Sequence, residues 1–209
     1  MANASPPIHL HHDDLPEGLD LGTVVAIDTE TMGLNPLRDR LCVVQLSAGD
    51  GEAHLVKIAH EAKPAPRLAA LLADPKVEIL FHFARFDLSV LSLNIGPIVG
   101  PIYCTKIASK LARTYTDRHG LADLVSESLG FSLSKAQQSS DWGHDSLSDE
   151  QIAYAASDVL YLHQIRERLD RMLEREGRMA EARACFDFLP VRCALDLNGF
   201  DHLDIFAHS

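Results

Sequence analysis

The sequence predicts a single α/β domain in which helices pack on a mixed β-sheet. Three observations support this fold class. Short apolar runs joined by turns open the chain, strand-like and helix-like segments then alternate, and 209 residues are few for two domains. We expect residues 1–209 to form one domain, with a core at about 20–165 and a C-terminal helical extension at about 166–209.

The first half of the chain has the pattern of strands. Prolines and glycines interrupt residues 1–22, which we interpret as a lead-in without a long element. The apolar runs at 24–27 and 41–46 predict buried strands. A glycine-rich turn at 49–51 predicts that a third strand, at 53–58, lies antiparallel to the second.

Strands and helices alternate in the middle of the chain. Leucines at helical spacing predict a helix at 66–74, and the apolar run after it predicts a strand at 77–81. The elements expected next are a helix at 85–93, a strand at 98–104, helices at 105–112 and 120–129, and an irregular polar segment at 132–147. A sheet flanked by helices accounts for this order.

The last part of the chain begins with a clear helix signal. Ser148 and Gln151 match a capping box, and the apolar residues that follow recur at helical spacing as far as Leu162. This helix either continues or restarts through the charged residues 166–182. Residues 185–209 contain apolar side chains without a clear period, so the periodicity gives no helix bounds in this part of the expected extension.

Composition and cysteine usage exclude several classes of protein. The chain is 46% hydrophobic and 23% charged, which is typical of globular proteins. No apolar stretch approaches the roughly 18 residues of a membrane-spanning helix, and the N-terminus lacks the pattern of a secretory signal. Cys42, Cys104, Cys185 and Cys193 form no CxxC pair, which favours reduced thiols over a zinc site. We therefore expect a cytoplasmic protein without a membrane partner.

The net charge limits the kind of nucleic acid that the chain can bind. With 19 basic and 30 acidic residues the net charge is −11, which argues against a broad basic surface for long nucleic acids. A small site that holds phosphate through metal ions and a local basic patch stays possible. The glycine-rich fingerprints of P-loops and of dinucleotide cofactor sites are both absent.

Two carboxylates stand at the end of the first predicted strand. Asp28 and Glu30 are two residues apart, so their side chains point to the same face. Neighbouring carboxylates repel each other unless cations or protons relieve them, and Mg²⁺ and Mn²⁺ prefer such oxygen ligands. The pattern indicates a metal site or, alternatively, a solvated strand end.

Two further motifs carry acidic residues at strand and helix positions. Asp87 follows the strand at 77–81, where it either serves the same site or pairs with Arg85. Tyr154 and Asp158 are four residues apart on a predicted helix and share one face. Small alanines between them allow close approach of a second element. Taken alone, this pair favours a core tyrosine beside a surface acid over a functional site.

Together these residues resemble the three exonuclease motifs of the DnaQ-like (DEDD) superfamily, in the subclass with a tyrosine in the third motif. The resemblance implies a ribonuclease H-like fold, with a mixed five-stranded sheet flanked by helices. The strings FHFARFD, QQSSDW and YAASDVLYLH are similar to the nano-RNase C family of alphaproteobacteria, which is related to ribonuclease D. Ribonuclease D carries helical domains after its catalytic domain, and we expect this chain to lack them.

The resemblance also implies a mechanism, two-metal-ion phosphodiester hydrolysis from the 3′ end, with Mg²⁺ or Mn²⁺ as the two ions. Asp28, Glu30 and Asp158 would hold the metal that binds the attacking water, and Asp28 would bridge to the second metal. Asp87 would act mainly through water. Tyr154 would orient the attacking water, because a phenol with a pKa of about 10 is a weak base at neutral pH.

A substrate class and an assembly follow from the same resemblance. It implies that the chain cleaves 5′-phosphorylated dinucleotides such as pGpG and forms a homo-octamer. The net charge favours the same substrates, because a very short RNA presents few phosphates for an acidic protein to repel.

Basic and apolar residues are candidates for binding this substrate. Lys106, Lys110 and Arg113 follow the spacing i, i+4, i+7 and would share one helical face, which either captures phosphate or is merely solvated. By resemblance, Leu34 inserts as an apolar wedge between the two bases; alternatively it packs on the sheet.

His82 and Arg85 are two further candidates for contact with the substrate. His82 stands five residues before Asp87, where many members of the superfamily have asparagine. It either positions Asp87 or touches the substrate. Arg85 lies between these two residues and is a candidate for the same role.

Competing interpretations stay open for the whole chain and for two segments. A trimmer of longer RNA like ribonuclease D, or a DNA exonuclease, would use the same acids, whereas an inactive binding scaffold would be expected to have lost some of them. Residues 137–142 either shape the site, contact another subunit or pack in the core. His9, His11 and His12 lie in the lead-in, which we interpret as mobile and without a carboxylate clamp, so no metal site is predicted there.

Overall fold

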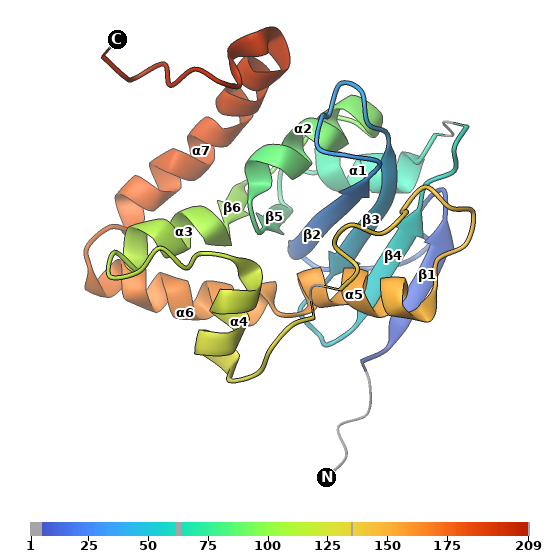
Figure 1. Ribbon diagram of the computed structural model, residues 1–209, viewed down its shortest axis with the longest axis horizontal. Helices are drawn as coiled ribbons and strands as arrows, with labels where there is room; N and C mark the ends of the chain where they lie inside the picture. Colours follow the sequence, from blue (N-terminus) through green and yellow to red (C-terminus); the bar gives the residue numbers. More distant parts are fainter. Residues whose placement is uncertain (1–5, 62–63, 135, 209) are drawn as a thin grey trace.

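A twisted six-stranded sheet lies at the centre of the computed structural model, which describes residues 6–61, 64–134 and 136–208 (Figure 1). The strand order is β1-β4-β3-β2-β5-β6. The strands are β1 (Ile8–His12), β2 (Val24–Thr31), β3 (Leu41–Ser47), β4 (Ala53–Lys57), β5 (Glu78–Phe81) and β6 (Ile102–Cys104). Strand β2 pairs antiparallel with β3 and parallel with β5, so the sheet is mixed, as predicted.

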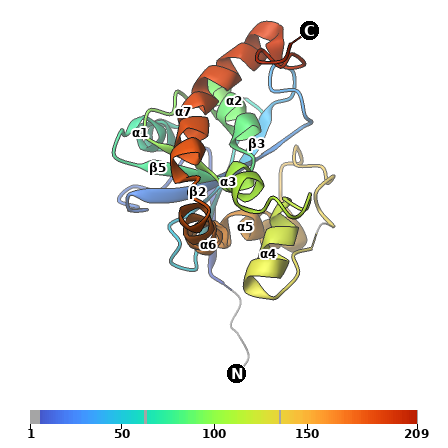
Figure 2. The ribbon, with the colours of Figure 1, turned by 90° about the vertical axis from the view of Figure 1, so that its left-hand side faces the viewer.

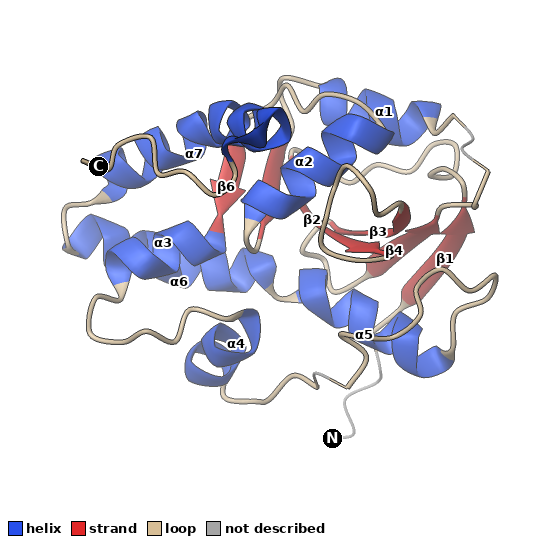
Figure 3. Cartoon of the chain, turned by 45° about the horizontal axis from the view of Figure 1, so that its top comes forward, coloured by secondary structure: helices blue, strands red, loops and turns tan. Residues whose placement is uncertain are grey.

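Seven α-helices accompany the sheet in the described part of the chain. They are α1 (Pro66–Ala73), α2 (Ala84–Asn94), α3 (Thr105–Ala112), α4 (Leu121–Leu129), α5 (Asp149–Leu160), α6 (Leu162–Arg175) and α7 (Met179–Leu195), and a short irregular helical segment, η1 (Asp196–Phe200), follows. Helix α5 covers β2, β3 and β4 on one face of the sheet, and α1 and α2 lie on the other (Figure 3). None of the described helices is long and apolar enough to cross a bilayer.

The resemblance predicted five strands, and the sixth is β1. This strand lies parallel to β4 at the edge of the sheet, with His9 beside His54 in register. Residues 1–22 were interpreted as a lead-in without a long element, and the short strand at residues 8–12 was not predicted. The strand has the sequence IHLHH. Its three histidines interrupt the apolar run that would have predicted a strand.

The beginning of α5 is fixed by the predicted capping box. The Ser148 hydroxyl accepts a hydrogen bond from the Gln151 backbone N–H at 3.2 Å, and the Gln151 side chain accepts one from the Ser148 N–H at 2.9 Å. Such a cap stabilises the first turn by about 1 kcal/mol. Because the cap sets where the helix starts, it also sets which α5 side chains face the sheet.

The C-terminal segment is helical, as predicted, and its helices have bounds that the periodicity did not supply. The charged stretch breaks and restarts: α6 ends at Arg175, Gly177 takes a left-handed backbone (φ 66°), and α7 follows. Helix α7 reaches Leu195, in the part of the chain without a clear period, and runs beside α2 (Figure 2). Its buried stripe is regular and consists of Ala182, Phe186, Leu189 and Cys193. Exposed Val191 and the interior Pro190 on other faces of the helix hide this period in the sequence.

Candidate active site

Strand β2 presents Asp28 and Glu30 toward α5. The strand is central in the sheet, and its residues alternate so that the two carboxylates share the face that α5 covers. The register with β3 shifts between Glu30 and Thr31. Such a bulge re-aims side chains at the end of a ladder. Both carboxylates are therefore held half-buried where the strand ends.

Helix α5 brings Tyr154 and Asp158 to the same place. The alanines between them, Ala155 and Ala156, are fully buried, which lets the helix lie close to the sheet. Carboxylate oxygens of Asp28, Glu30 and Asp158 lie within 4.8 Å of one another. Residues 130 positions apart in the sequence thus converge on one point.

Asp87 joins this group from the first turn of α2. Its side chain is buried, and its carboxylate accepts a 2.6 Å hydrogen bond from the Thr29 hydroxyl. Thr29 stands between Asp28 and Glu30 on the opposite face of β2, so this bond ties the strand to the helix. Positive φ at Phe83 (72°), just before the helix, sets the direction in which α2 starts.

Burial raises the pKa of all four carboxyls, and the charges of neighbouring acids raise those of Asp28, Glu30 and Asp158 further. Burial is the largest cause in each case; it raises the pKa of Glu30 to about 9 and those of Asp87 and Asp158 to about 7. The pKa of Asp28 is raised well above its ordinary value by burial and by the charges of the other three acids. In the described ranges, no lysine or arginine forms an ion pair with any of the four.

A divalent cation would fit this cluster. Four acids, one buried and three half-buried, form a site of excess negative charge, and carboxylate oxygens are the ligands that Mg²⁺ and Mn²⁺ prefer. Asp28, Glu30 and Asp158 offer one oxygen each within the reach of a single ion.

This electrostatic arrangement predicts how stability depends on pH and metal. Glu30, Asp87 and Asp158 have folded pKa values of about 7 to 9, whereas unfolded carboxyls have a pKa of about 4, so stability is lost as pH rises from about 4 to about 9. Below about pH 6.5 the buried His82, with a pKa lowered to about 3, acts in the opposite direction. The stability of the protein at two pH values should therefore be compared above about pH 6.5.

We expect the metal-free protein to unfold several degrees lower at about pH 8.5 than at about pH 6.5, because each kcal/mol shifts Tm by roughly 2–4 °C at this size. Saturating Mg²⁺ should remove the difference, since it binds the ionised carboxylates. Differential scanning calorimetry with EDTA or with Mg²⁺ measures both curves. A metal-free Tm that rises across this interval would contradict the account.

Tyr154 stands beside the carboxylates as a neutral hydrogen-bonding group. Burial, followed by the charges of Asp158, Glu30 and Asp28, raises the pKa of its phenol above the ordinary value. It therefore keeps its proton at neutral pH and acts as a donor and acceptor rather than as a base. The ring lies 6.1 Å from that of Trp142, centroid to centroid.

The acids and Tyr154 line a cleft of about 950 Å³ with apolar walls. Leu34 projects from its rim with 88% of its surface exposed. His82 lines the cleft, and its Nδ1 lies 2.9 Å from the Thr105 hydroxyl. Because that hydroxyl donates to the Phe81 carbonyl, Nδ1 must be the donor to it, which leaves the second ring nitrogen as an acceptor.

The predicted basic face is only partly present. Lys106 is half-buried, with its ammonium 4.4 Å from the ring centre of Phe83, and Lys110 is exposed on the same helix. Helix α3 ends at Ala112, so Arg113 leaves the helical face and is only 3% exposed. Its guanidinium pairs with Glu127 and donates to the Arg118 carbonyl at 2.7 Å. Arg113 therefore does not share an exposed face with the lysines and has no part in the cleft.

Arg85 also differs from its prediction. It pairs with Asp196 after α7 and donates to the Asp201 carbonyl at 2.9 Å, rather than pairing with Asp87 or lining the carboxylate cleft. The partner is a residue of the C-terminal segment, 111 positions away, so no local pattern indicated this ion pair.

Two aromatic residues of the cleft were missed or left open by the sequence. Phe83 lines the cleft and is half-exposed, and its left-handed backbone has no sequence signal. Trp142 is buried and forms part of the cleft wall, so it both packs and shapes the site. The other polar residues of that segment at the cleft are Gln138, Ser139 and Ser140.

Comparison with known proteins gives a consistent result. A family model described as 3′–5′ exonuclease matches residues 12–174. A solved structure of Brucella melitensis NrnC is 56% identical with a TM-score of 0.94, and the match covers 97% of this chain and 99% of that one. Structures described as NrnC with bound Mg²⁺ and bound to pGG match at 54% and 55% identity, with TM-scores of 0.92 and 0.94; they cover 97% and 98% of this chain, and 100% of each NrnC chain.

Ribonuclease D from Granulibacter bethesdensis is a more distant relative. It is 41% identical over 156 residues, which are 75% of this chain and 39% of that protein. The chain thus spans well under half the length of this relative, whereas it covers nearly all of NrnC. The chain therefore belongs to the 3′–5′ exonuclease family and, within it, is an NrnC-like nuclease.

Proposed function

We propose that this exonuclease hydrolyses short oligoribonucleotides from the 3′ end to mononucleotides, with dinucleotides such as pGpG as the main substrates. The observation that carries the proposal is the cleft where four carboxylates and Tyr154 converge beneath an exposed leucine. The relative bound to pGG, which this chain matches over nearly its full length, supports the same substrate class.

The carboxylates would hold two divalent ions, Mg²⁺ or Mn²⁺. Asp28, Glu30 and Asp158 would bind one of them, and Asp28 would be shared with the second, with Asp87 acting mainly through water. When bound, such ions stabilise the negative charge that develops on the entering and leaving oxygens of the phosphodiester. The Mg²⁺ bound in the relative supports the first of these metals.

The chain's own residues orient the reacting groups. The neutral Tyr154 hydroxyl would form a hydrogen bond with the attacking water. This bond would orient the water toward the phosphorus atom. Thr29 holds Asp87 in one orientation through the hydrogen bond between β2 and α2. Trp142 packs beside Tyr154 and limits how far the phenol can move.

Groups on the rim and floor of the cleft would select the substrate. Leu34 would separate the two bases, and the half-exposed ring of Phe83 offers a stacking surface. The acceptor nitrogen of His82 suits a ribose hydroxyl. Lys106, held against Phe83, and exposed Lys110 would attract the 5′ phosphate.

Substitution of Leu34 tests this arrangement. Leu34→Ala should lower kcat/KM for pGpG about 10-fold, because it removes roughly 1.4 kcal/mol of apolar contact with the bases. Leu37→Ala is a matched control, since Leu37 is exposed on the same loop but does not line the cleft. Steady-state kinetics of both variants give the comparison, and equal effects would remove Leu34 from the substrate site.

Comparing substrate lengths tests the proposed specificity. Hydrolysis of 5′-labelled pGpG should be at least about 10-fold faster per 3′ end than that of a single-stranded RNA 20-mer, a difference of roughly 1.4 kcal/mol. Equal rates per end would favour a trimmer of longer RNA like ribonuclease D, and comparable cleavage of a DNA dinucleotide would exclude selection by a ribose hydroxyl. Absence of any hydrolysis with Mg²⁺ or Mn²⁺ would indicate a binding scaffold.

Assembly, domain limits and location complete the proposal. A homo-octamer is supported by exposed apolar residues at the C-terminal end, where Leu203 and Phe206 are uncovered. Residues 1–209 would act as one exonuclease domain, with the helices from about 166 onward as its extension. The four cysteines are all free, which suits the reducing cytoplasm. Sedimentation velocity of the full chain measures the assembly.

A further inference from the structure

A cluster of metal-binding side chains lies at the edge of the sheet, where no metal site was predicted. Strand β1 contributes His9 and His11, and β4 with the turn before it contributes His54 and Glu52. The sequence separates these two pairs by about forty residues, and the parallel pairing of β1 with β4 brings His9 beside His54. The carboxylate that the N-terminal histidines lack in the sequence is supplied by Glu52.

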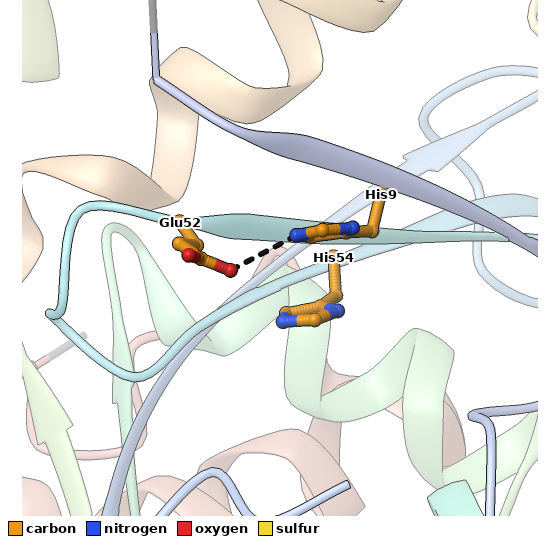
Figure 4. A group of neighbouring side chains, drawn as sticks. All are labelled: His9, Glu52 and His54. Carbon is orange, nitrogen blue, oxygen red and sulfur yellow. Dashed lines mark hydrogen bonds and ion pairs between the residues drawn. The ribbon is translucent and has the colours of Figure 1, made fainter.

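Three of these side chains converge closely enough for one ion. Ligand atoms of His9, Glu52 and His54 all lie within 4.8 Å of one another. His9 Nε2 is 2.9 Å from a Glu52 oxygen (Figure 4). The imidazole rings of His9 and His54 are stacked, with their centroids 4.8 Å apart. In a tetrahedral site with ligand bonds of about 2.1 Å, neighbouring ligand atoms are roughly 3.4 Å apart. Small side-chain rotations therefore suffice.

The fourth side chain, His11, is placed to orient the site. Its Nε2 lies 3.1 Å from His54 Nδ1, which is a hydrogen-bonding distance. A metal-binding histidine usually forms a hydrogen bond through its other ring nitrogen, which fixes the ring and its tautomer. His54 is only 8% exposed and is thus held in place, whereas His9 is open to solvent and leaves room for an ion and a water ligand.

This cluster is separate from the carboxylate cleft. His54, Leu46 and Ile27 are register partners across β4, β3 and β2, so their side chains share one face of the sheet. Asp28 follows Ile27 and points to the other face. A metal ion bound by the histidines would therefore lie across the sheet from the catalytic acids.

We propose that His9, His54 and Glu52 form a binding site for a first-row transition-metal ion such as Zn²⁺, and that the ion fastens β1 to β4. Two imidazoles and one carboxylate form a donor set that suits Zn²⁺, Cu²⁺ or Ni²⁺ better than Mg²⁺. An ion held by both strands would stabilise the edge of the sheet, because it links residues 9 and 54 directly.

Cobalt titration of the full chain, with Mg²⁺ in excess, tests this proposal. Co²⁺ in a four-coordinate site with nitrogen ligands absorbs visible light far more strongly than Co²⁺ in a six-coordinate oxygen site. One equivalent of Co²⁺ should therefore produce a strong visible band, and Zn²⁺ should displace it. The Asp28→Ala variant should keep the band, because its substitution affects only the carboxylate cleft.

Variants at the edge strand identify the ligands. His9→Ala should weaken Co²⁺ and Zn²⁺ binding at least 10-fold, as should Glu52→Gln; both side chains are accessible enough to be replaced without opening the core. His12→Ala is a matched control, since His12 is exposed on the same strand but points to the opposite face. The proposal is overturned if the wild type gives no strong band, if His9→Ala leaves the band unchanged, or if Asp28→Ala abolishes it.

Discussion

Asp28→Ala should abolish hydrolysis of pGpG, lowering kcat by roughly four orders of magnitude, which corresponds to about 5.5 kcal/mol of transition-state stabilisation. Asp28 is the central acid of the cluster, because it alone has its pKa raised by the charges of all three others. Its removal would take away the ligand proposed to be shared by both ions. Single-turnover kinetics with saturating Mg²⁺ measure the loss.

The stability of the same variant distinguishes loss of chemistry from loss of folding. Removing one of four mutually repelling carboxylates should leave the metal-free Tm unchanged or higher, since no described cation depends on Asp28 for its partner. Asp187→Ala, at an exposed position of α7, is a matched control and should retain full activity. Wild-type turnover by Asp28→Ala would refute the proposed role of the acids.

Tyr154→Phe should lower kcat about 100-fold, at the lower end of what a positioned proton-handling group contributes. The variant keeps the ring that packs against Trp142 and removes only the hydroxyl that would orient the water. The Mg²⁺ concentration needed for half-maximal activity should stay the same, because Tyr154 is not among the three residues whose ligand atoms converge.

A second tyrosine provides the control for that variant. Tyr161 follows α5 and packs edge-on against Phe131, outside the cleft. Tyr161→Phe should therefore leave kcat unchanged. If Tyr154→Phe changed only the Mg²⁺ dependence, or had no effect on kcat, the hydroxyl would not be the group that orients the water.

Short-range periodicity was sufficient to predict the parts of the site that lie on one element. The two-residue period of a strand placed Asp28 beside Glu30, and the four-residue spacing of a helix placed Tyr154 beside Asp158. Only the resemblance to an exonuclease family predicted that these two pairs lie together. A local sequence pattern does not indicate which strand a helix packs on. The capping box at Ser148 was predictable because it is made by neighbours in the sequence.

The features that escaped prediction depend on partners distant in the sequence. Strand β1 forms because β4 offers a free edge, and its histidines carry no apolar signal. Arg113 satisfies its charge with Glu127 across a turn, and Arg85 does so with Asp196, more than a hundred residues away. In both cases the tertiary structure determines the ion-pair partner. Helical spacing had assigned Arg113 to the substrate, and its position between His82 and Asp87 had made Arg85 a candidate.

The order of the acids along the chain has a consequence for protein synthesis. Asp28 leaves the ribosome early, but α5, which carries Asp158, is made 130 residues later. A nascent chain that has formed only β2 and α2 therefore holds an incomplete set of ligands. We expect nuclease activity to arise only once the emerging α5 docks on the sheet.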